Sequence, residues 1–304
     1  MTNIFFCDRT NLGSSIGLDS SVDKKLTNTF KYASTLGMYS IQLCFGSMES
    51  YTRSKVKDSD IISAKKIQDR SGLHIFSHMP YLYNLCGSSK QIAWEDNKEQ
   101  NNKTLAMIKS MEYELGIFAK FNTGKYKSGC VVHPGNLNKS QENKKILQKG
   151  IEAIAQTINK IKFPENSMLL LENCAGEKNK IAKNLDELVK IYELVKCKKN
   201  VGICIDTCHL YGCGEKNMNM GKVDDINNFF KEFDHKLGLD KLKLIHLNDS
   251  KEKFGSCKDR HEYIGQGFIW NENLSILSYF LDKTREIPVV LETCIDDYYV
   301  IQSL

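Results

Sequence analysis

The chain has 304 residues, of which 41% are hydrophobic and 26% charged, the composition of a globular protein with a full core. No apolar run approaches the roughly 18 residues that a membrane helix needs, and the opening MTNIFFCD is too short an apolar run for a signal peptide. The net charge of +5 is compatible with nucleic-acid binding but does not demand it. We therefore expect a soluble intracellular protein, not secreted, in the cytoplasm, the nucleus or a viral compartment.

The chain contains eleven cysteines, scattered from Cys7 to Cys294. Their number is odd and no C-x-x-C pair occurs. Cys44, Cys130 and Cys204 fall inside apolar, strand-like runs, where a thiol behaves as a small hydrophobic side chain. We expect reduced, packed thiols rather than disulfides.

Short apolar or β-branched runs alternate with helix-like stretches along the whole sequence. The predicted strands are 12–17, 40–45, 73–78, 129–133, 167–172, 201–206, 243–246 and 287–292. Between them lie stretches with apolar residues spaced at three and four, such as 22–37, 102–121 and 143–161. Eight strands that alternate with helices predict an α/β fold, a single-domain (β/α)₈ TIM barrel. An open doubly wound sheet is the alternative, which the missing Gly-rich phosphate turn disfavours.

The strong strands share one feature, because each of the six that follow residue 70 ends in a residue type that binds transition metals. These residues are His78, His133, Glu172, Asp206, His246 and Glu292. In a closed barrel the C-terminal ends of all strands meet at one mouth, so the six are expected to converge. Three further candidates lie just beyond the strands, namely His209 in D-T-C-H, and Asp259 and His261 in D-R-H.

A lone histidine at a strand end is more often structural than a ligand, and a terminal glutamate often only caps a strand. Six such residues in series are not explained in this way, because unpaired buried carboxylates are costly. Imidazole and carboxylate ligands without thiolate favour zinc, with Mn²⁺ or iron as alternative occupants. Nine ligands suit a cluster of two or three ions, the arrangement used in phosphoryl transfer.

Four other residues of ligand type are interpreted as structural. His74 lies within a strand and His235 in a helical stretch. Cys204 is expected to pack inside the barrel, and Cys208 lies between two better candidates.

The segments VGICIDTCHLYGCG (201–214) and HLNDSKEKFGSCKDRHEYIGQG (246–267) closely resemble the two signature segments of the endonuclease IV family of apurinic/apyrimidinic (AP) endonucleases. HMPYLYNL, VVHPG, LLLEN and LET match its remaining motifs in the right order. The resemblance covers residues 12 to about 295, nearly the whole chain.

The resemblance implies a TIM barrel that binds three zinc ions (Zn²⁺) through nine side chains. The first ion would be held by His78, His133 and Glu172, and the third by His209, Asp259 and His261. Glu172 would bridge to a second ion, bound also by Asp206, His246 and Glu292. Glu292 and Glu172 are the implied catalytic residues, with Glu292 orienting or deprotonating the attacking water.

The implied activity is hydrolysis of the phosphodiester 5′ to an abasic site in double-stranded DNA, which leaves a 3′-hydroxyl and a 5′-deoxyribose phosphate. Removal of groups that block 3′ ends (3′-phosphodiesterase/phosphatase activity) would accompany it, and both reactions belong to base excision repair. We expect a monomer.

Two departures concern the DNA-binding surface and the N-terminus. Residues 1–11 form an N-terminal extension before the predicted barrel domain, 12–304. Where the family often carries a DNA-penetrating basic residue, GSMESYTR offers Glu49, with Arg53 further on. Tyr81 and Leu82, directly after a rigid Met-Pro turn, are the expected wedge into the vacated base stack, and Arg53 and Arg260 the expected basic contacts.

Two other functions stay open from the sequence. A metal-dependent sugar isomerase or epimerase also builds a His, Glu and Asp site at a barrel mouth, but with one or two metals it leaves His209, Asp259 and His261 without purpose. A zinc-stabilised protein that binds damaged DNA without turnover is the second.

Overall fold

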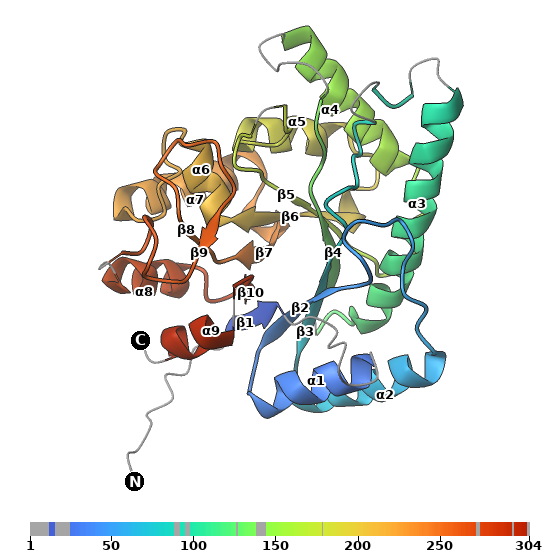
Figure 1. Cartoon of the computed structure of the whole chain (residues 1–304), viewed down its shortest axis with the longest axis horizontal. Coiled ribbons are helices and arrows are strands. Elements are labelled where there is room, and N and C mark those ends of the chain that lie inside the picture. The colour runs from blue at the N-terminus through green and yellow to red at the C-terminus, as the bar shows by residue number, and fades with distance from the viewer. Residues whose placement is uncertain are drawn as a thin grey trace.

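The structure, a computed structural model, describes residues 12–15, 25–87, 92–94, 98–125, 127–137, 144–177, 179–271, 274–293 and 295–302. Eight parallel strands close into a barrel in the order β1-β2-β3-β4-β5-β6-β7-β10, with β10 paired back to β1 (Figure 1). The predicted single-domain TIM barrel is therefore confirmed. The extension predicted at 1–11 lies outside the described residues.

All eight predicted strands form the barrel wall. They are β1 (Leu12–Ser15), β2 (Ser40–Cys44), β3 (His74–His78), β4 (Ser128–Val132), β5 (Leu169–Glu172), β6 (Val201–Asp206), β7 (Leu242–His246) and β10 (Val289–Leu291). A second, two-stranded antiparallel sheet, β8 (Asp249–Ser250) with β9 (His261–Glu262), follows β7 at the barrel mouth. It was not predicted, because two-residue strands leave no periodic signal.

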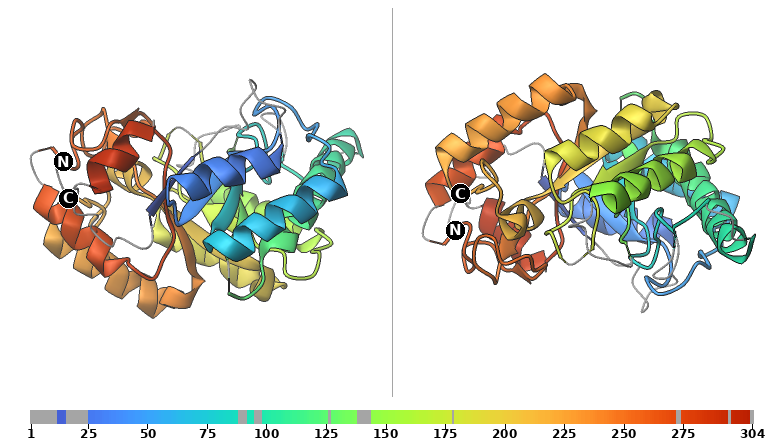
Figure 2. Two further views of the ribbon diagram at one scale, coloured as in Figure 1. Left: turned by 90° about the horizontal axis from the view of Figure 1, so that it is seen from below. Right: turned by 90° about the horizontal axis from the view of Figure 1, so that it is seen from above.

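Helices surround the barrel on its outside, as Figure 2 shows from two sides. They are α1 (Leu26–Thr35), α2 (Asp58–Ser71), α3 (Lys98–Phe118), α4 (Lys144–Asn159), α5 (Leu185–Leu194), α6 (Thr207–Cys213), α7 (Val223–Lys236), α8 (Leu274–Lys283) and α9 (Ile295–Gln302). Short 3₁₀ turns, Ala119–Phe121, Lys198–Asn200 and Leu239–Lys241, precede or follow some of them. Neighbouring helices pack in pairs along the wall, α1 with α2, α4 with α5 and α7 with α8.

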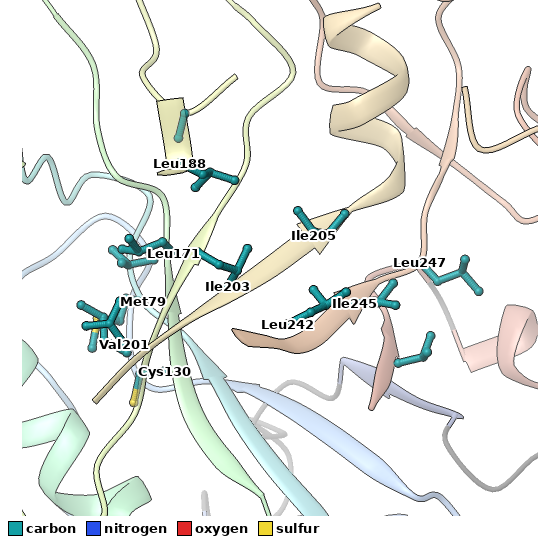
Figure 3. Close-up of a cluster of buried hydrophobic side chains, with 14 of the residues drawn as sticks. Met79, Cys130, Leu171, Leu188, Val201, Ile203, Ile205, Leu242, Ile245 and Leu247 are labelled. Atoms are coloured by element: carbon teal, nitrogen blue, oxygen red, sulfur yellow. The ribbon is translucent and has the colours of Figure 1, made fainter. Parts of the chain in front are cut away.

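The apolar residues of the strands divide into two layers, because successive side chains of a strand point to opposite faces. The outer layer packs between the wall and the helices, and Figure 3 shows Leu171, Ile203 and Ile245 within it. The inner layer fills the barrel and consists of Phe76, Val131, Leu170, Cys204, Leu244 and Val290. Cys204 therefore packs inside the barrel, as predicted.

His74 and His235 take structural positions, as predicted. His74 opens β3, where its ring stacks on Tyr39 with ring centroids 4.4 Å apart and its Nδ1 accepts a hydrogen bond from the Lys127 amide at 2.8 Å. Burial, helped by the charge of Lys127, lowers the pKa of His74 to about 4. His235 is exposed on α7.

The low pKa of His74 predicts an acid-sensitive step in stability. Between pH 6.5 and 4 the unfolded chain binds a proton at this residue that the folded chain does not, so stability falls as the pH falls and levels off below about 4. The full loss is about 3 kcal/mol. The free energy of unfolding, measured by urea denaturation at several pH values, should depend less steeply on pH in His74→Gln than in wild type. The exposed control His235→Gln should show the same pH dependence as wild type. Equal slopes in wild type and His74→Gln would contradict this assignment.

The cysteines of the described part of the chain are free thiols, as the sequence predicts. Among the described helices, none is both long and apolar enough to cross a membrane.

Candidate metal centre at the barrel mouth

Six predicted ligands follow directly from the inner layer of the barrel. Each lies two residues after an inner-layer residue, at the last position of the strand or, for His133 and Glu292, one residue beyond it, and a step of two along extended backbone returns to the same face. The pairs are Phe76 and His78, Val131 and His133, Leu170 and Glu172, Cys204 and Asp206, Leu244 and His246, and Val290 and Glu292. The apolar inner layer of the barrel thus lies directly beneath the six polar side chains.

Glu172, at the end of β5, lies at the centre of the site and is fully buried. Its Oε2 faces His78 Nε2 at 3.1 Å and His133 Nε2 at 3.6 Å. Its Oε1 faces His246 Nδ1 at 2.8 Å. Each carboxylate oxygen therefore serves a different group of side chains, the geometry that a bridging ligand requires.

The candidate ligands gather into three groups whose ligand atoms lie within 4.8 Å of one another. The first group is His78, His133 and Glu172. The second is Glu172, Asp206, His246 and Glu292. The third is His209, Asp259 and His261. These are the three sets that the resemblance implied, and the structure brings all nine side chains together.

The third group is assembled by two elements outside the barrel wall. Asp206 caps the N-terminus of α6, where its Oδ1 accepts from the His209 amide at 2.9 Å, so His209 sits in the first turn. The β8–β9 hairpin supplies the others. Asp259 lies 3.1 Å from His209 Nε2 through Oδ2 and 3.1 Å from His261 Nε2 through Oδ1. His261 Nε2 also lies 3.6 Å from Asp206 Oδ2, which joins this group to the second.

Three histidines are oriented by a hydrogen bond from one ring nitrogen to a carbonyl oxygen of the main chain or of an amide side chain. His78 Nδ1 donates to the Met79 carbonyl at 2.7 Å, and His209 Nδ1 to the Asn173 carbonyl at 2.9 Å. His246 Nε2 donates to Gln42 Oε1 at 2.7 Å. Such bonds fix ring and tautomer, and leave the other nitrogen as a metal ligand.

Two nitrogens of the third group show that these residues fit a metal ion. Among the described residues, no partner meets the geometry of a hydrogen bond with the buried His209 Nε2 or His261 Nε2, although an Asp259 oxygen lies 3.1 Å from each. A buried polar atom left unpaired costs about 1–3 kcal/mol, so such atoms call for an explanation. Both nitrogens face Asp259, and a cation placed among the three side chains would satisfy both.

Charge at the site points the same way. Burial opposes a positive charge on His78 and on His261, but the adjacent carboxylates of Glu172 and Asp259, respectively, raise the pKa of each imidazole to about 9. Burial would raise the pKa of Glu172, yet the neighbouring imidazoles of His246 and His78 hold it well below its usual range, whereas burial lowers the pKa of His133 to about 3 and keeps that ring neutral. Protons on histidines thus balance the carboxylates, and metal ions bind by displacing such protons.

Cys208 is close to this site and could form a fourth ligand group with Asp206 and His261. Its Sγ lies near Asp206 and His261, and its thiol donates to the Arg260 carbonyl at 3.7 Å. Burial raises the pKa of the Cys208 thiol far above its usual range, which keeps the thiol protonated. This supports the interpretation of Cys208 as structural.

Two amide side chains that sequence reasoning missed connect the carboxylates. Gln42 Nε2 donates to Glu292 Oε1 at 2.7 Å while its Oε1 holds His246. Asn248 Nδ2 donates to Asp206 Oδ2 at 2.6 Å and to Glu292 Oε2 at 3.0 Å. Gln42 was visible as a polar residue within an otherwise apolar strand, and Asn248 as part of H-L-N-D, so both carried a signal.

Asp249 anchors the hairpin and is not a member of any ligand group. It is fully buried and accepts hydrogen bonds from the amides of Ser250, Gly265, Gly267 and Ile269, at 2.8 to 3.2 Å. A Cβ at Gly267 would meet Asp249 Oδ1 at 2.4 Å, so glycine is required there. Asp249 thereby fixes the loop that delivers Asp259 and His261.

A cavity of about 500 Å³ opens over the three groups, large enough for a small ligand. Tyr81 lines it, is 57% exposed, and donates from its hydroxyl to Glu49 Oε1 at 2.8 Å across the rim. Leu82 is half-buried and packs against the main core. Arg260 is exposed beside the third group.

Arg53, which the sequence predicted to contact DNA, is buried in the structure. Its guanidinium donates to the carbonyl of Phe45 at 3.1 Å and to those of Ser47 and Ser50. It also lies 3.9 Å from the buried Glu114. Arg53 therefore holds together the loop that follows β2.

Comparison with known proteins agrees with this geometry. A family model described as "Xylose isomerase-like TIM barrel" matches residues 30–297. The chain is 31% identical over 291 residues to "Probable endonuclease 4" of Nitrosopumilus maritimus, covering 94% of each chain. It is 33% identical over 269 residues to "Probable endonuclease 4" of Alkaliphilus oremlandii, covering 85% of this chain and 86% of the relative.

Solved structures show the same fold. Endonuclease IV from Thermus thermophilus superposes with a TM-score of 0.74 at 22% identity, covering 96% of this chain and 98% of the other. A D-tagatose 3-epimerase-like protein gives a TM-score of 0.63 at 17% identity, covering 96% and 94%. At these identities both matches support the barrel fold alone. Endonuclease and epimerase activity must therefore be distinguished by the sequence relatives and by the residues of the site.

Proposed function

The chain belongs to the endonuclease IV family, and we propose that it is a metal-dependent DNA-repair hydrolase that cuts double-stranded DNA at abasic sites. It would hydrolyse the phosphodiester 5′ to the lesion, leaving a 3′-hydroxyl and a 5′-deoxyribose phosphate, and would clear blocked 3′ ends. We propose three Zn²⁺ per chain, a monomeric state and an intracellular location.

The observation that carries this proposal is the third ligand group. A sugar isomerase or epimerase needs one or two ions, and the first two groups, which share Glu172, would meet that need. His209, Asp259 and His261 have no use in such an enzyme, yet Asp259 faces both buried imidazole nitrogens, His209 Nε2 and His261 Nε2, at 3.1 Å, and within the described part of the chain no group completes a well-formed hydrogen bond to either. A phosphodiester has attacking, leaving and non-bridging oxygens to stabilise, which suits three groups around one cavity.

Divalent ions held at the three groups would supply the positive charge and Lewis acidity that phosphodiester hydrolysis requires. The protein's own contribution begins at Glu292. Burial would raise the pKa of Glu292, but the charge of His246 lowers it, so the carboxylate is ionised at neutral pH and can accept a proton. Gln42 and Asn248 hold one Glu292 oxygen each, which aims the group into the cavity.

The test is a nicking assay. Purified zinc-loaded protein should cut a labelled duplex at a single abasic site, produce a 3′-hydroxyl end, and leave the undamaged duplex intact. Parallel incubation with ketohexoses should yield no epimer. Epimerised sugar without nicking would contradict the proposal and identify the protein as a sugar epimerase. Tight binding of abasic DNA without turnover would identify it as a damage-binding protein.

We propose that Tyr81 fills the gap left when the abasic sugar turns out of the duplex. Flipping costs least where no base pair is broken, and the vacated stack then needs an aromatic or apolar side chain. Tyr81 stands exposed at the cavity rim, whereas Leu82, the other wedge candidate, is partly committed to the core.

Tyr81→Ala is expected to weaken binding to abasic duplex by about tenfold to a hundredfold, the range for loss of one aromatic stacking partner. Metal content and removal of a 3′-phosphate from a frayed end should change little. The matched control is Tyr32→Ala, an exposed tyrosine on α1. Equal losses on both substrates, or in the control, would remove Tyr81 from the recognition surface.

A further inference from the structure

Lys180 is a basic residue whose main chain is fixed at the cavity rim. It follows β5 and forms an antiparallel bridge with Asn136, in the loop after β4. The Leu137 amide donates to the Asn179 carbonyl at 2.7 Å, and the Ile181 amide donates to the Gly135 carbonyl at 2.9 Å. The loops that leave two neighbouring strands are therefore tied together on both sides of Lys180.

The side chain of Lys180 is held as firmly as its backbone. Its Nζ donates to Glu177 Oε1 at 2.8 Å, and the side chain is 33% exposed. The second oxygen of Glu177 is buried and has no hydrogen-bond partner among the described residues. Among the described residues, the ammonium group of Lys180 is therefore the one side-chain partner shown for the Glu177 carboxylate.

Lys180 lines the same cavity as two of the ligand groups. It lines the cavity together with His133 of the first group and with His209 and Asp259 of the third. Its charge acts on His133, and Asp259 acts on Lys180 in turn. Of the described residues that line the cavity, Lys180 alone carries an ammonium or guanidinium group.

We propose that Lys180 is a substrate-binding residue whose Nζ donates a hydrogen bond to a non-bridging oxygen of the phosphate bound between the first and third groups. A lysine ammonium has three donors, so the bond to Glu177 and a bond to phosphate can exist together. Glu177 then acts as a positioning residue, because it keeps the flexible lysine chain pointed along the rim. The inference rests on the proposed function, since it assumes a phosphate ester as the substrate.

The experiment titrates inorganic phosphate into the zinc-loaded full chain by calorimetry, for wild type, Lys180→Met, Lys180→Arg and Lys216→Met. Lys216 is exposed and does not line the cavity, which makes it the matched control. Lys180→Met should weaken phosphate binding by about tenfold or more, the effect of losing one charge-assisted hydrogen bond. Lys180→Arg should recover most of the loss and Lys216→Met should bind as wild type, with metal content equal in all four proteins.

Three results would overturn the assignment. They are unchanged phosphate affinity in Lys180→Met, an equal loss in Lys216→Met, and a loss that tracks reduced metal content. The titration is also independent of DNA cleavage. If the wild type fails to nick abasic DNA, the proposed function fails, while phosphate binding by Lys180 is still decided by its own measurement.

Discussion

Glu172→Gln is expected to lower nicking of abasic duplex by at least about 10²–10⁴-fold, the range for loss of a positioned acid–base group, because it disrupts two ligand groups at once. The two oxygens of Glu172 face different partners, Oε2 towards His78 and His133 and Oε1 towards His246. A glutamine offers one oxygen and one amide nitrogen, so one of the two groups loses its shared ligand. Metal analysis should show a loss from the first two groups, and steady-state nicking kinetics should show the fall in turnover.

Glu114→Gln is the matched control for that substitution. Glu114 is also a fully buried glutamate, but it belongs to none of the ligand groups, and burial raises its pKa to about 7. A neutral amide should be tolerated there with near-normal metal content and turnover. Near-normal nicking by Glu172→Gln would show that the bridging carboxylate has been placed wrongly.

Removal of metal is expected to abolish nicking and also to weaken DNA binding by folded protein. Four carboxylates face the cavity, namely Glu172, Asp206, Asp259 and Glu292. Without metal, protonated histidines such as His78 and His261, each with its pKa raised to about 9, largely balance them. Three divalent ions would displace those protons and leave the site at about +2, a field that attracts the phosphate backbone.

Fluorescence anisotropy with abasic duplex, before and after chelation, measures this effect, and circular dichroism confirms that the metal-free protein is folded. Restoring zinc should release protons in a weakly buffered solution. The apparent zinc affinity should also rise with pH, because the raised histidine pKa values make protons compete with metal below about pH 9. Equal DNA affinity with and without metal would mean that the positive charge of the metal-bound site does not contribute to DNA binding.

The sequence predicted the barrel and the nine candidate ligands for physical reasons that the structure makes visible, and the family resemblance implied their division into three sets. Strand-end polar residues such as Glu172 and His246 were recognisable because each interrupts an apolar run. The inner layer beneath them, Leu170 and Leu244, explains why they point inward, since a step of two keeps the same face of the strand. What the sequence could not supply was the hydrogen bonding around the ligands.

Gln42 illustrates the limit. Its partners, His246 and Glu292, lie 204 and 250 residues away in sequence, and only closure of β1 onto β10 brings them together. Arg53 illustrates the same limit, because the sequence shows a basic residue in a loop near the mouth but not the three main-chain carbonyl groups that accept hydrogen bonds from its guanidinium. In both cases the deciding partners are main-chain or distant groups that leave no local pattern.

The central claim, that nine side chains at the barrel mouth hold three metal ions, is tested most directly by elemental analysis of protein purified without chelator. The structure offers three ligand groups, two of them joined by Glu172, with ligand atoms within 4.8 Å in each. About three metal ions per chain, predominantly zinc, is the predicted result. A reproducible content of one metal ion per folded, fully active chain would contradict it.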